Sequence, residues 1–68
     1  MVRARCVRFI PGKGFGFLRR LDDPNAEDVF FHKSALGGDE LEVGDLVDVE
    51  VVDNGRGPRA ALLMRVEG

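Results

Sequence analysis

The most restrictive feature of this sequence is a period-two alternation in residues 46–52. Three valines alternate there with two acids, and on an extended strand successive side chains point to opposite faces. The valines would therefore line one face and the acids the other, which is the pattern of a half-buried β-strand. The alternating residues are Val47, Asp48, Val49, Glu50 and Val51.

Turn-forming residues divide the remainder of the chain into further short segments of strand character. The cluster of Asp, Asn, Gly and Pro in residues 53–58 separates the last two segments as a hairpin. The predicted strands are residues 2–10, 14–20, 28–32, 46–52 and 59–66. Residues 33–36 suit a single helical turn, and no amphipathic helix is indicated elsewhere.

The number and shortness of the strands favour a closed architecture. Five short strands in 68 residues cannot hide their edges as a flat sheet, whereas closure removes the edges. We therefore expect one domain, residues 1–68, folded as an all-β, five-stranded antiparallel barrel. The buried face of the last strand stays undecided, because apolar residues occupy both parities: Ala61 and Leu63 against Leu62, Met64 and Val66.

The chain offers neither a disulfide framework nor a zinc site, because Cys6 is its single cysteine and His32 its single histidine. Cys6 lies in an alternating segment, which favours a small buried hydrophobic residue over the alternative of a reactive thiol. No apolar run approaches the roughly 20 residues of a membrane-spanning helix. We expect a soluble, unexported, cytoplasmic monomer that binds no cofactor, metal or small-molecule substrate.

Charge is strongly segregated along the chain, although the formal net charge is only −2. Residues 1–20 carry +6, residues 21–53 carry −10 and residues 54–68 carry +2. If the first and last segments meet in the fold, their bases form a cationic surface able to attract a polyanion. The alternative is that the charges neutralise one another across neighbouring strands. Charge alone leaves both arrangements open.

Four flat rings fall on one face of two predicted strands. Phe15 and Phe17 alternate with glycines in the segment GKGFGFL, and Phe30 and His32 share a parity in DVFFHKSAL. If the two strands pair, these rings form one cluster. Phenylalanine is usually buried, so the first interpretation of such a cluster is the hydrophobic core.

The glycines favour the opposite interpretation, an exposed ring surface. Gly14 and Gly16 take the parity opposite to the rings. Burying the rings would place these glycines in solvent, where a polar β-former would stabilise the sheet better. Inward glycines, in contrast, fit the tight curvature of a small barrel.

Basic residues border the predicted ring surface. They are Lys13, Lys33, Arg19 and Arg20, although the two arginines are equally compatible with a plain solvated strand end. A ring surface with cationic margins suits single-stranded nucleic acid, because bases stack on flat rings and phosphates need countercharge.

The ring-bearing segments resemble the two ribonucleoprotein motifs of bacterial cold-shock domains, KGFGFL the first and DVFFHKSAL the second. LEVGDLVDVEV is similar to the family's fourth strand, and NGRGPRAA to the segment before its last strand. The resemblance thus covers nearly the whole chain. It implies an oligonucleotide/oligosaccharide-binding (OB-fold) barrel that binds single-stranded RNA or DNA with little sequence preference. It also implies an RNA chaperone or a modulator of transcription or translation rather than an enzyme.

The resemblance assigns contact roles to individual positions. Base-stacking positions of the family are matched by Phe15, Phe17, Phe30 and His32. Flanking contact positions are matched by Lys13, Arg56 and Pro58, and an acid at the edge of the binding face by Asp28. The complete set of predicted nucleic-acid-binding residues is Arg8, Lys13, Phe15, Phe17, Phe30, His32, Lys33, Arg56 and Pro58.

The chain departs from the family pattern at three aromatic positions. Arg8 stands where the family usually has tryptophan, Lys33 stands where it has an aromatic residue, and residues 37–40 form a shorter loop without a ring. The segment from Arg19 to Glu27 is longer than is typical. Because stacking contributes about 1–3 kcal/mol per base, and a guanidinium both stacks and attracts phosphate, we expect weaker and more salt-sensitive binding than the family norm.

Other chemistries fit the sequence poorly. The spaced glycines do not form a dinucleotide-binding loop, because Phe17 stands where that motif needs glycine. Ser34 and His32 lack an orienting acid and an oxyanion site, so no catalytic arrangement is indicated. The main alternative is a protein-binding or regulatory barrel that has lost useful nucleic-acid affinity. Salt dependence separates the two, because binding to phosphates weakens as salt rises.

Overall fold

The structure is a computed structural model that describes residues 1–66. Five strands and one 3₁₀ turn follow in the order β1 (Val2–Ile10), β2 (Phe15–Arg20), β3 (Val29–His32), η1 (Lys33–Leu36), β4 (Leu46–Asp53) and β5 (Pro58–Arg65). Each predicted segment is confirmed to within one residue at its ends. The last two residues of the predicted domain, 67 and 68, lie outside the described residues.

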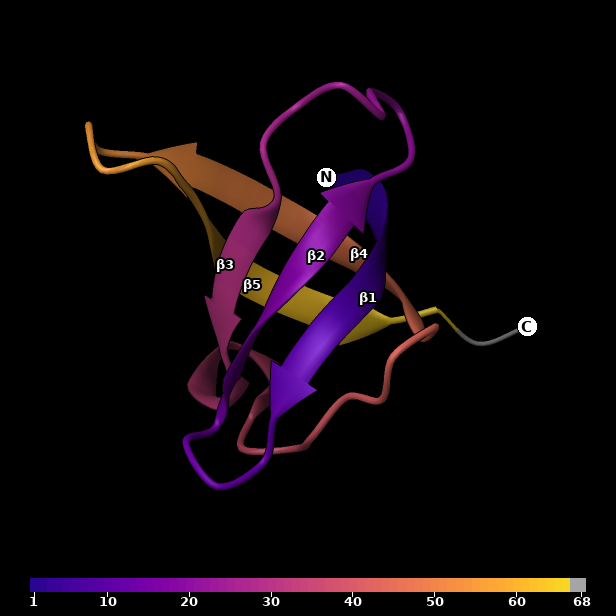
Figure 1. Cartoon of the computed structure of the whole chain (residues 1–68), viewed down its shortest axis with the longest axis vertical. Coiled ribbons are helices and arrows are strands. Elements are labelled where there is room, and N and C mark those ends of the chain that lie inside the picture. The colour runs from indigo at the N-terminus through magenta and orange to yellow at the C-terminus, as the bar shows by residue number, and fades with distance from the viewer. Residues whose placement is uncertain (67–68) are drawn as a thin grey trace.

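The strands close into a barrel with the neighbour order β1-β2-β3-β5-β4. In Figure 1, β1, β2 and β3 form the near layer, and β4 and β5 cross behind them. The expected all-β barrel is confirmed, with one detail that the sequence did not indicate: β3 and β5 run parallel where Phe30 pairs with Arg59. The other pairings of the described strands are antiparallel.

The core lies between these two layers. Val47 and Val49 of β4 are fully buried, as the valine alternation predicts, whereas Val51 is half-buried near the end of the strand. Cys6 is fully buried, which confirms its interpretation as a small hydrophobic residue. The buried hydrophobic set is Ala4, Cys6, Leu18, Val29, Phe31, Leu41, Val47, Val49, Ala60 and Leu63.

A bulge in the last hairpin explains why neither parity of β5 accounts for its buried side. Glu50 pairs with Leu62 while Val51 pairs with Ala60, so Ala61 is an extra residue with no partner on β4. Because a bulge reverses the alternation, Ala60 and Leu63 both face the core although their numbers differ in parity.

A second bulge lies in β1. Cys6 pairs with Leu18 of β2 and Arg8 pairs with Phe17, so Val7 is the extra residue. Continuous alternation from Cys6 would point Arg8 into the core. The bulge instead leaves Arg8 exposed on the outside of the barrel.

Neutralisation of charges, one of the two arrangements considered from the sequence, occurs in the fold. Neutralisation involves four pairs: Arg3–Asp48 at 3.2 Å, Arg19–Asp28 at 3.5 Å, Arg20–Asp22 at 2.7 Å and Arg65–Asp45 at 3.1 Å. The hydrogen bonds between Arg20 and Asp22 lower the pKa of that carboxyl. All four pairs are partly exposed, and such pairs contribute only about 0–1 kcal/mol each.

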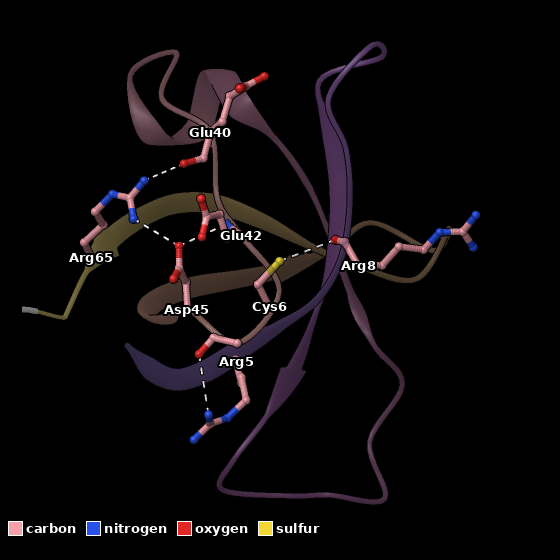
Figure 2. Close-up of polar contacts among 8 residues, drawn as sticks. Arg5, Cys6, Arg8, Glu40, Glu42, Asp45 and Arg65 are labelled. Atoms are coloured by element: carbon pink, nitrogen blue, oxygen red, sulfur yellow. Dashed lines mark hydrogen bonds and ion pairs between the residues drawn. The ribbon is translucent and has the colours of Figure 1, made fainter.

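The connection between η1 and β4 is held against β1 and β5 by polar contacts (Figure 2). The Arg65 guanidinium donates to Asp45 Oδ2 at 3.1 Å and to the backbone oxygen of Glu40. Asp45 Oδ2 also accepts from the Glu42 amide at 2.9 Å, and the Cys6 amide donates to the Asp45 backbone oxygen at 2.9 Å. These contacts bring the acidic connection alongside the end of β5.

Candidate functional site

Four rings gather on the outer side of β2 and β3. The register pairs Phe15 with His32 and Phe17 with Phe30 across the two strands. The ring centroids of Phe15 and Phe30 are 5.7 Å apart with the planes tilted by 35°, and those of Phe17 and Phe30 are 5.9 Å apart in an edge-to-face contact. We call Phe15, Phe17, Phe30 and His32 the ring face.

The ring face points away from the core. Phe30 is 39% exposed, His32 is exposed, and Phe15 and Phe17 are half-buried against their neighbours. The alternate residues of β3, Val29 and Phe31, are buried. The rings therefore present flat apolar surface to solvent, as the glycine argument predicts.

Gly16 explains why the orientation of β2 cannot be reversed. A Cβ built on Gly16 would lie 2.1 Å from the backbone oxygen of Arg8 and 2.9 Å from Cε1 of Phe31. That space is occupied because the Phe31 ring stacks on the Phe9 ring beneath the strand, at a centroid distance of 5.9 Å. Only a hydrogen atom fits at this position, so the bulky side chains of β2 lie outside.

His32 is held in one orientation by the start of η1. Its Nδ1 accepts a hydrogen bond from the Ser34 amide at 3.1 Å and lies 2.9 Å from Ser34 Oγ. Because an amide can only donate, Nδ1 is an acceptor, and the neutral ring carries its proton on Nε2. His32 thus serves as the cap of the 3₁₀ turn while its ring extends the ring face.

Arg8 stands beside Phe17, its partner across β1 and β2. Figure 2 shows its side chain extending away from the other labelled residues and out from the barrel. The two residues line a hollow at the margin of the ring face, with Val7, Arg19, Glu27 and Asp28 as the remaining lining residues. The predicted edge acid, Asp28, lies here, where it pairs with Arg19.

Two further hollows adjoin Phe30 on its other side. One is lined by Asn54, Arg56, Gly57, Pro58 and Arg59, so that the predicted contacts Arg56 and Pro58 come together there with Phe30. The other is lined by His32, Ser34, Ala35, Arg59, Ala60 and Ala61. Hollows therefore lie on both sides of the ring face, each with an arginine in its wall.

Arg59 is the basic residue of this surface that sequence reasoning missed. It is exposed, it pairs with Phe30 across β3 and β5, and it belongs to both hollows beside that ring. No local pattern marks it. Its place depends on the parallel pairing of two strands that are far apart in the chain.

The two predicted lysines differ in their placement. Lys13 is exposed in the turn that leads into β2, two residues before Phe15. Lys33 has the parity of buried Phe31, and its stem packs over Gly14, where a Cβ would lie 3.2 Å from Lys33 Cδ and Cε. The Lys33 stem therefore lies against the turn that leads into β2, and Lys33 is not among the lining residues of the three hollows described above.

The basic residues differ in whether an acid pairs with them. Within residues 1–66, no ion pair involves Arg8, Lys13, Lys33, Arg56 or Arg59. Most of the arginines remote from the rings are neutralised by acids. Arg8, Arg56 and Arg59, which line the hollows beside the rings, therefore have no paired acid within residues 1–66.

The single cysteine of the chain lies in the core rather than at the ring face. Burial raises the pKa of the Cys6 thiol, which keeps it protonated and unreactive in the native state. Residues 1–66 contain no group of three His, Cys, Asp or Glu side chains arranged to hold a metal ion. In the same described part of the chain, no helix is long and apolar enough to cross a membrane.

Comparison with known proteins is consistent with this geometry. Residues 3–66 match the family described as "'Cold-shock' DNA-binding domain". The cold shock-like protein CspC of Bacillus cereus is 40% identical over an aligned length of 68 residues. The alignment covers 96% of this chain and 100% of that protein. The cold shock-like protein CspD of Bacillus cereus is 50% identical over 52 residues, covering 72% and 74% of the two chains. The cold shock protein CspA of Staphylococcus aureus is 42% identical over 57 residues, covering 79% and 82%.

Proposed function

Because this chain belongs to the cold-shock domain family, whose members generally bind nucleic acid, we propose that it binds single-stranded RNA or DNA by stacking bases on its ring face. The single observation that carries the proposal is the outward cluster of Phe15, Phe17 and Phe30. This cluster is bordered by the arginines Arg8, Arg56 and Arg59, which have no acidic partner within residues 1–66. Paired bases in a duplex keep their faces covered, so such a surface favours single strands.

The geometry supports a nucleic-acid strand that crosses the ring face from the hollow beside Arg8 to the two hollows beside Arg59. Bases stack on exposed ring faces, and such stacking contributes about 1–3 kcal/mol per base. Phosphates would be neutralised by Arg8 at one margin and by Arg56 and Arg59 at the other. Because the contacts are to ring faces and to charges, they carry little base specificity.

We further propose that binding is weaker and more salt-dependent than in relatives that have a ring at the position of Arg8. Two features support this. Arg8 stands where the family usually has an aromatic ring, so charge replaces stacking area at this position, and the segment 37–40 supplies no ring. A guanidinium that contacts phosphate adds about 0.7 to the slope of log affinity against log salt on a single strand.

The functional unit in this proposal is one copy of the domain of residues 1–68. It acts in the cytoplasm as an RNA chaperone or as a modulator of transcription or translation, and it catalyses no reaction. It needs no cofactor and takes no small-molecule substrate. Two features support this part of the proposal. The chain belongs to the cold-shock domain family, and the side chains of the site offer ring faces for stacking and charges for phosphates.

The proposal is tested by fluorescence anisotropy with a labelled pyrimidine-rich single strand and the corresponding duplex. A labelled probe is needed because the protein contains neither Trp nor Tyr. We expect the single strand to bind more tightly than the duplex. We also expect the logarithm of the affinity to fall linearly with the logarithm of the salt concentration. The slope should be about −2 to −3 if three or four basic side chains contact phosphates.

A lack of preference for the single strand would contradict the proposal. That outcome, together with affinity independent of salt, would favour a barrel that serves as a protein-binding module. A preference that survives at high salt would place the affinity in the rings rather than in the arginines.

A further inference from the structure

A polar hollow of about 610 Å³ lies between the β2–β3 connection and the β4–β5 turn. Both segments stand at the upper end of the barrel in Figure 1. The charged side chains in the wall of this hollow are Arg20, Glu27, Asp53 and Arg56. We call it the end hollow.

The end hollow adjoins the hollows beside the ring face, because it shares lining residues with them. Glu27 also lines the hollow that contains Phe17. Arg56 and Pro58 also line one of the hollows beside Phe30. A strand stacked on the ring face can therefore place a neighbouring base in the end hollow.

Two of the four charged side chains in the end hollow already have partners. Arg20 pairs with Asp22 at 2.7 Å, and Asp53 Oδ1 accepts hydrogen bonds from two amides of its own turn at 2.9 and 3.3 Å. Within residues 1–66, no ion pair involves Glu27 or Arg56. One carboxylate and one guanidinium are thus available to a ligand of this hollow.

Glu27 comes from the β2–β3 connection, but its carboxylate reaches the facing turn. A Cβ built on Gly57 would lie 3.6 Å from Glu27 Oε2. Arg56 directly precedes Gly57 in that turn. A hydrogen-bond acceptor and a hydrogen-bond donor therefore belong to neighbouring parts of one wall.

The carboxylate selects the part of a nucleotide that fits this hollow. It repels phosphate and accepts from N–H groups, so it favours a base edge over the backbone. Among the common bases, guanine alone presents two adjacent donors, N1–H and N2–H₂, beside an acceptor, O6. The two oxygens of a carboxylate can accept from both donors at once, which makes the contact bidentate. A single strand leaves this edge of the base free, whereas a duplex covers it.

We propose that the end hollow binds a guanine base of the single strand and that Glu27 determines this preference. The Glu27 carboxylate accepts from N1–H and N2–H₂, and Arg56 donates to O6. The ring face holds the neighbouring bases without selecting among them. This inference rests on the proposed function, to which it adds base specificity at one position.

The test uses fluorescence anisotropy with a labelled all-thymidine strand and with strands in which one deoxyguanosine replaces each thymidine in turn. We expect deoxyguanosine at one position to raise the affinity about tenfold, the effect of one bidentate contact. Deoxyinosine there lacks the N2 amino group and should lose most of the gain. The 7-deaza analogue of guanine lacks only the N7 acceptor and should retain it.

Glu27→Gln tests the protein side of the same contact. Glutamine has one carbonyl oxygen and one amino group, so it cannot accept from both donors, and the guanine preference should disappear. The affinity for the all-thymidine strand should be retained, because the ring face is unchanged. Glu42→Gln is the matched control: it removes the same charge from an exposed glutamate at the opposite end of β4, and it should leave the preference intact.

Three results would overturn the inference while leaving the proposed function standing. One is equal affinity of the parent protein for the thymidine and guanine strands, and another is a guanine preference that survives in Glu27→Gln. The third is an equal rise in affinity for every strand in Glu27→Gln, which would mean that Glu27 only repels phosphate. Failure of the all-thymidine strand to bind more tightly than a duplex would instead contradict the proposed function, and this inference with it.

Discussion

The thiol of Cys6 donates a hydrogen bond to the backbone oxygen of Arg8, with sulfur and oxygen 3.5 Å apart, across the bulge of β1 (Figure 2). The same Arg8 oxygen lies over Gly16 of β2, where no side chain can be accommodated. One backbone oxygen thus connects the core, the bulge and the ring-bearing strand. The outward course of the Arg8 side chain follows from this arrangement.

Gly16→Ala tests this close approach. The added methyl group would lie 2.1 Å from the Arg8 oxygen, so β1 and β2 must separate. We expect the free energy of unfolding to fall by about 1–3 kcal/mol or more, measured by urea denaturation followed by circular dichroism. Gly12→Ala is the matched control, because nothing lies within 4 Å of its Cβ position. Similar effects of the two substitutions would contradict the predicted clash.

Phe30 and Phe31 are adjacent residues of one type on opposite faces of β3, and they separate binding from stability. Phe30→Ala should weaken single-strand binding by about 1–3 kcal/mol with little loss of stability. Phe31→Ala should lower the free energy of unfolding by about 3–5 kcal/mol, because it empties the core beneath Gly16. Anisotropy and urea denaturation measure the two effects. Equal destabilisation by both substitutions would mean that Phe30 is a core residue.

Arg8 and Arg3 lie on the same strand but differ in their electrostatic surroundings. Arg8 has no acidic partner within residues 1–66, whereas Arg3 pairs with Asp48 at 3.2 Å. Arg8→Ala should reduce the slope of log affinity against log salt by about 0.7, the loss of one phosphate contact on a single strand. Arg3→Ala should leave the slope unchanged. An unchanged slope for Arg8→Ala would remove this residue from the phosphate-contacting set.

Cys6 links stability to alkaline pH. Burial raises the pKa of its thiol in the folded state, so above roughly pH 8.5, the ordinary thiol pKa, the unfolded chain loses this proton before the native one. Stability is therefore complete below that pH and declines as the pH rises toward the native pKa. Between neutral and alkaline pH, the urea midpoint of unfolding should fall further for the parent protein than for Cys6→Ala. An identical decline in both proteins would show that other groups cause it.

Much of the fold follows from local sequence pattern. The alternating valines of residues 46–52 and the turn-forming residues between segments predict all five strands, because strand period and turn chemistry are properties of neighbouring residues. The parity of Phe15, Phe17, Phe30 and His32 likewise predicts their shared face. The glycines opposite them indicate that this face lies outside.

Local pattern fails where two segments distant in the chain must be fitted together. Sequence pattern leaves the buried side of β5 undecided, because the bulge at Ala61 reverses its alternation. Arg59 becomes part of the site only through the parallel pairing with Phe30. Lys33, which follows His32 directly, is instead turned toward Gly14.

Period and turn propensity act over a few residues, and they account for the strands, the turns between them and the side of β2 and β3 that carries rings. The register between strands depends on packing in the closed barrel, where a bulge is accepted if it fills the core better than regular pairing does. That choice turns Arg8 outward beside Phe17, places Arg59 beside Phe30, and exposes Leu62 and Met64 on the opposite layer.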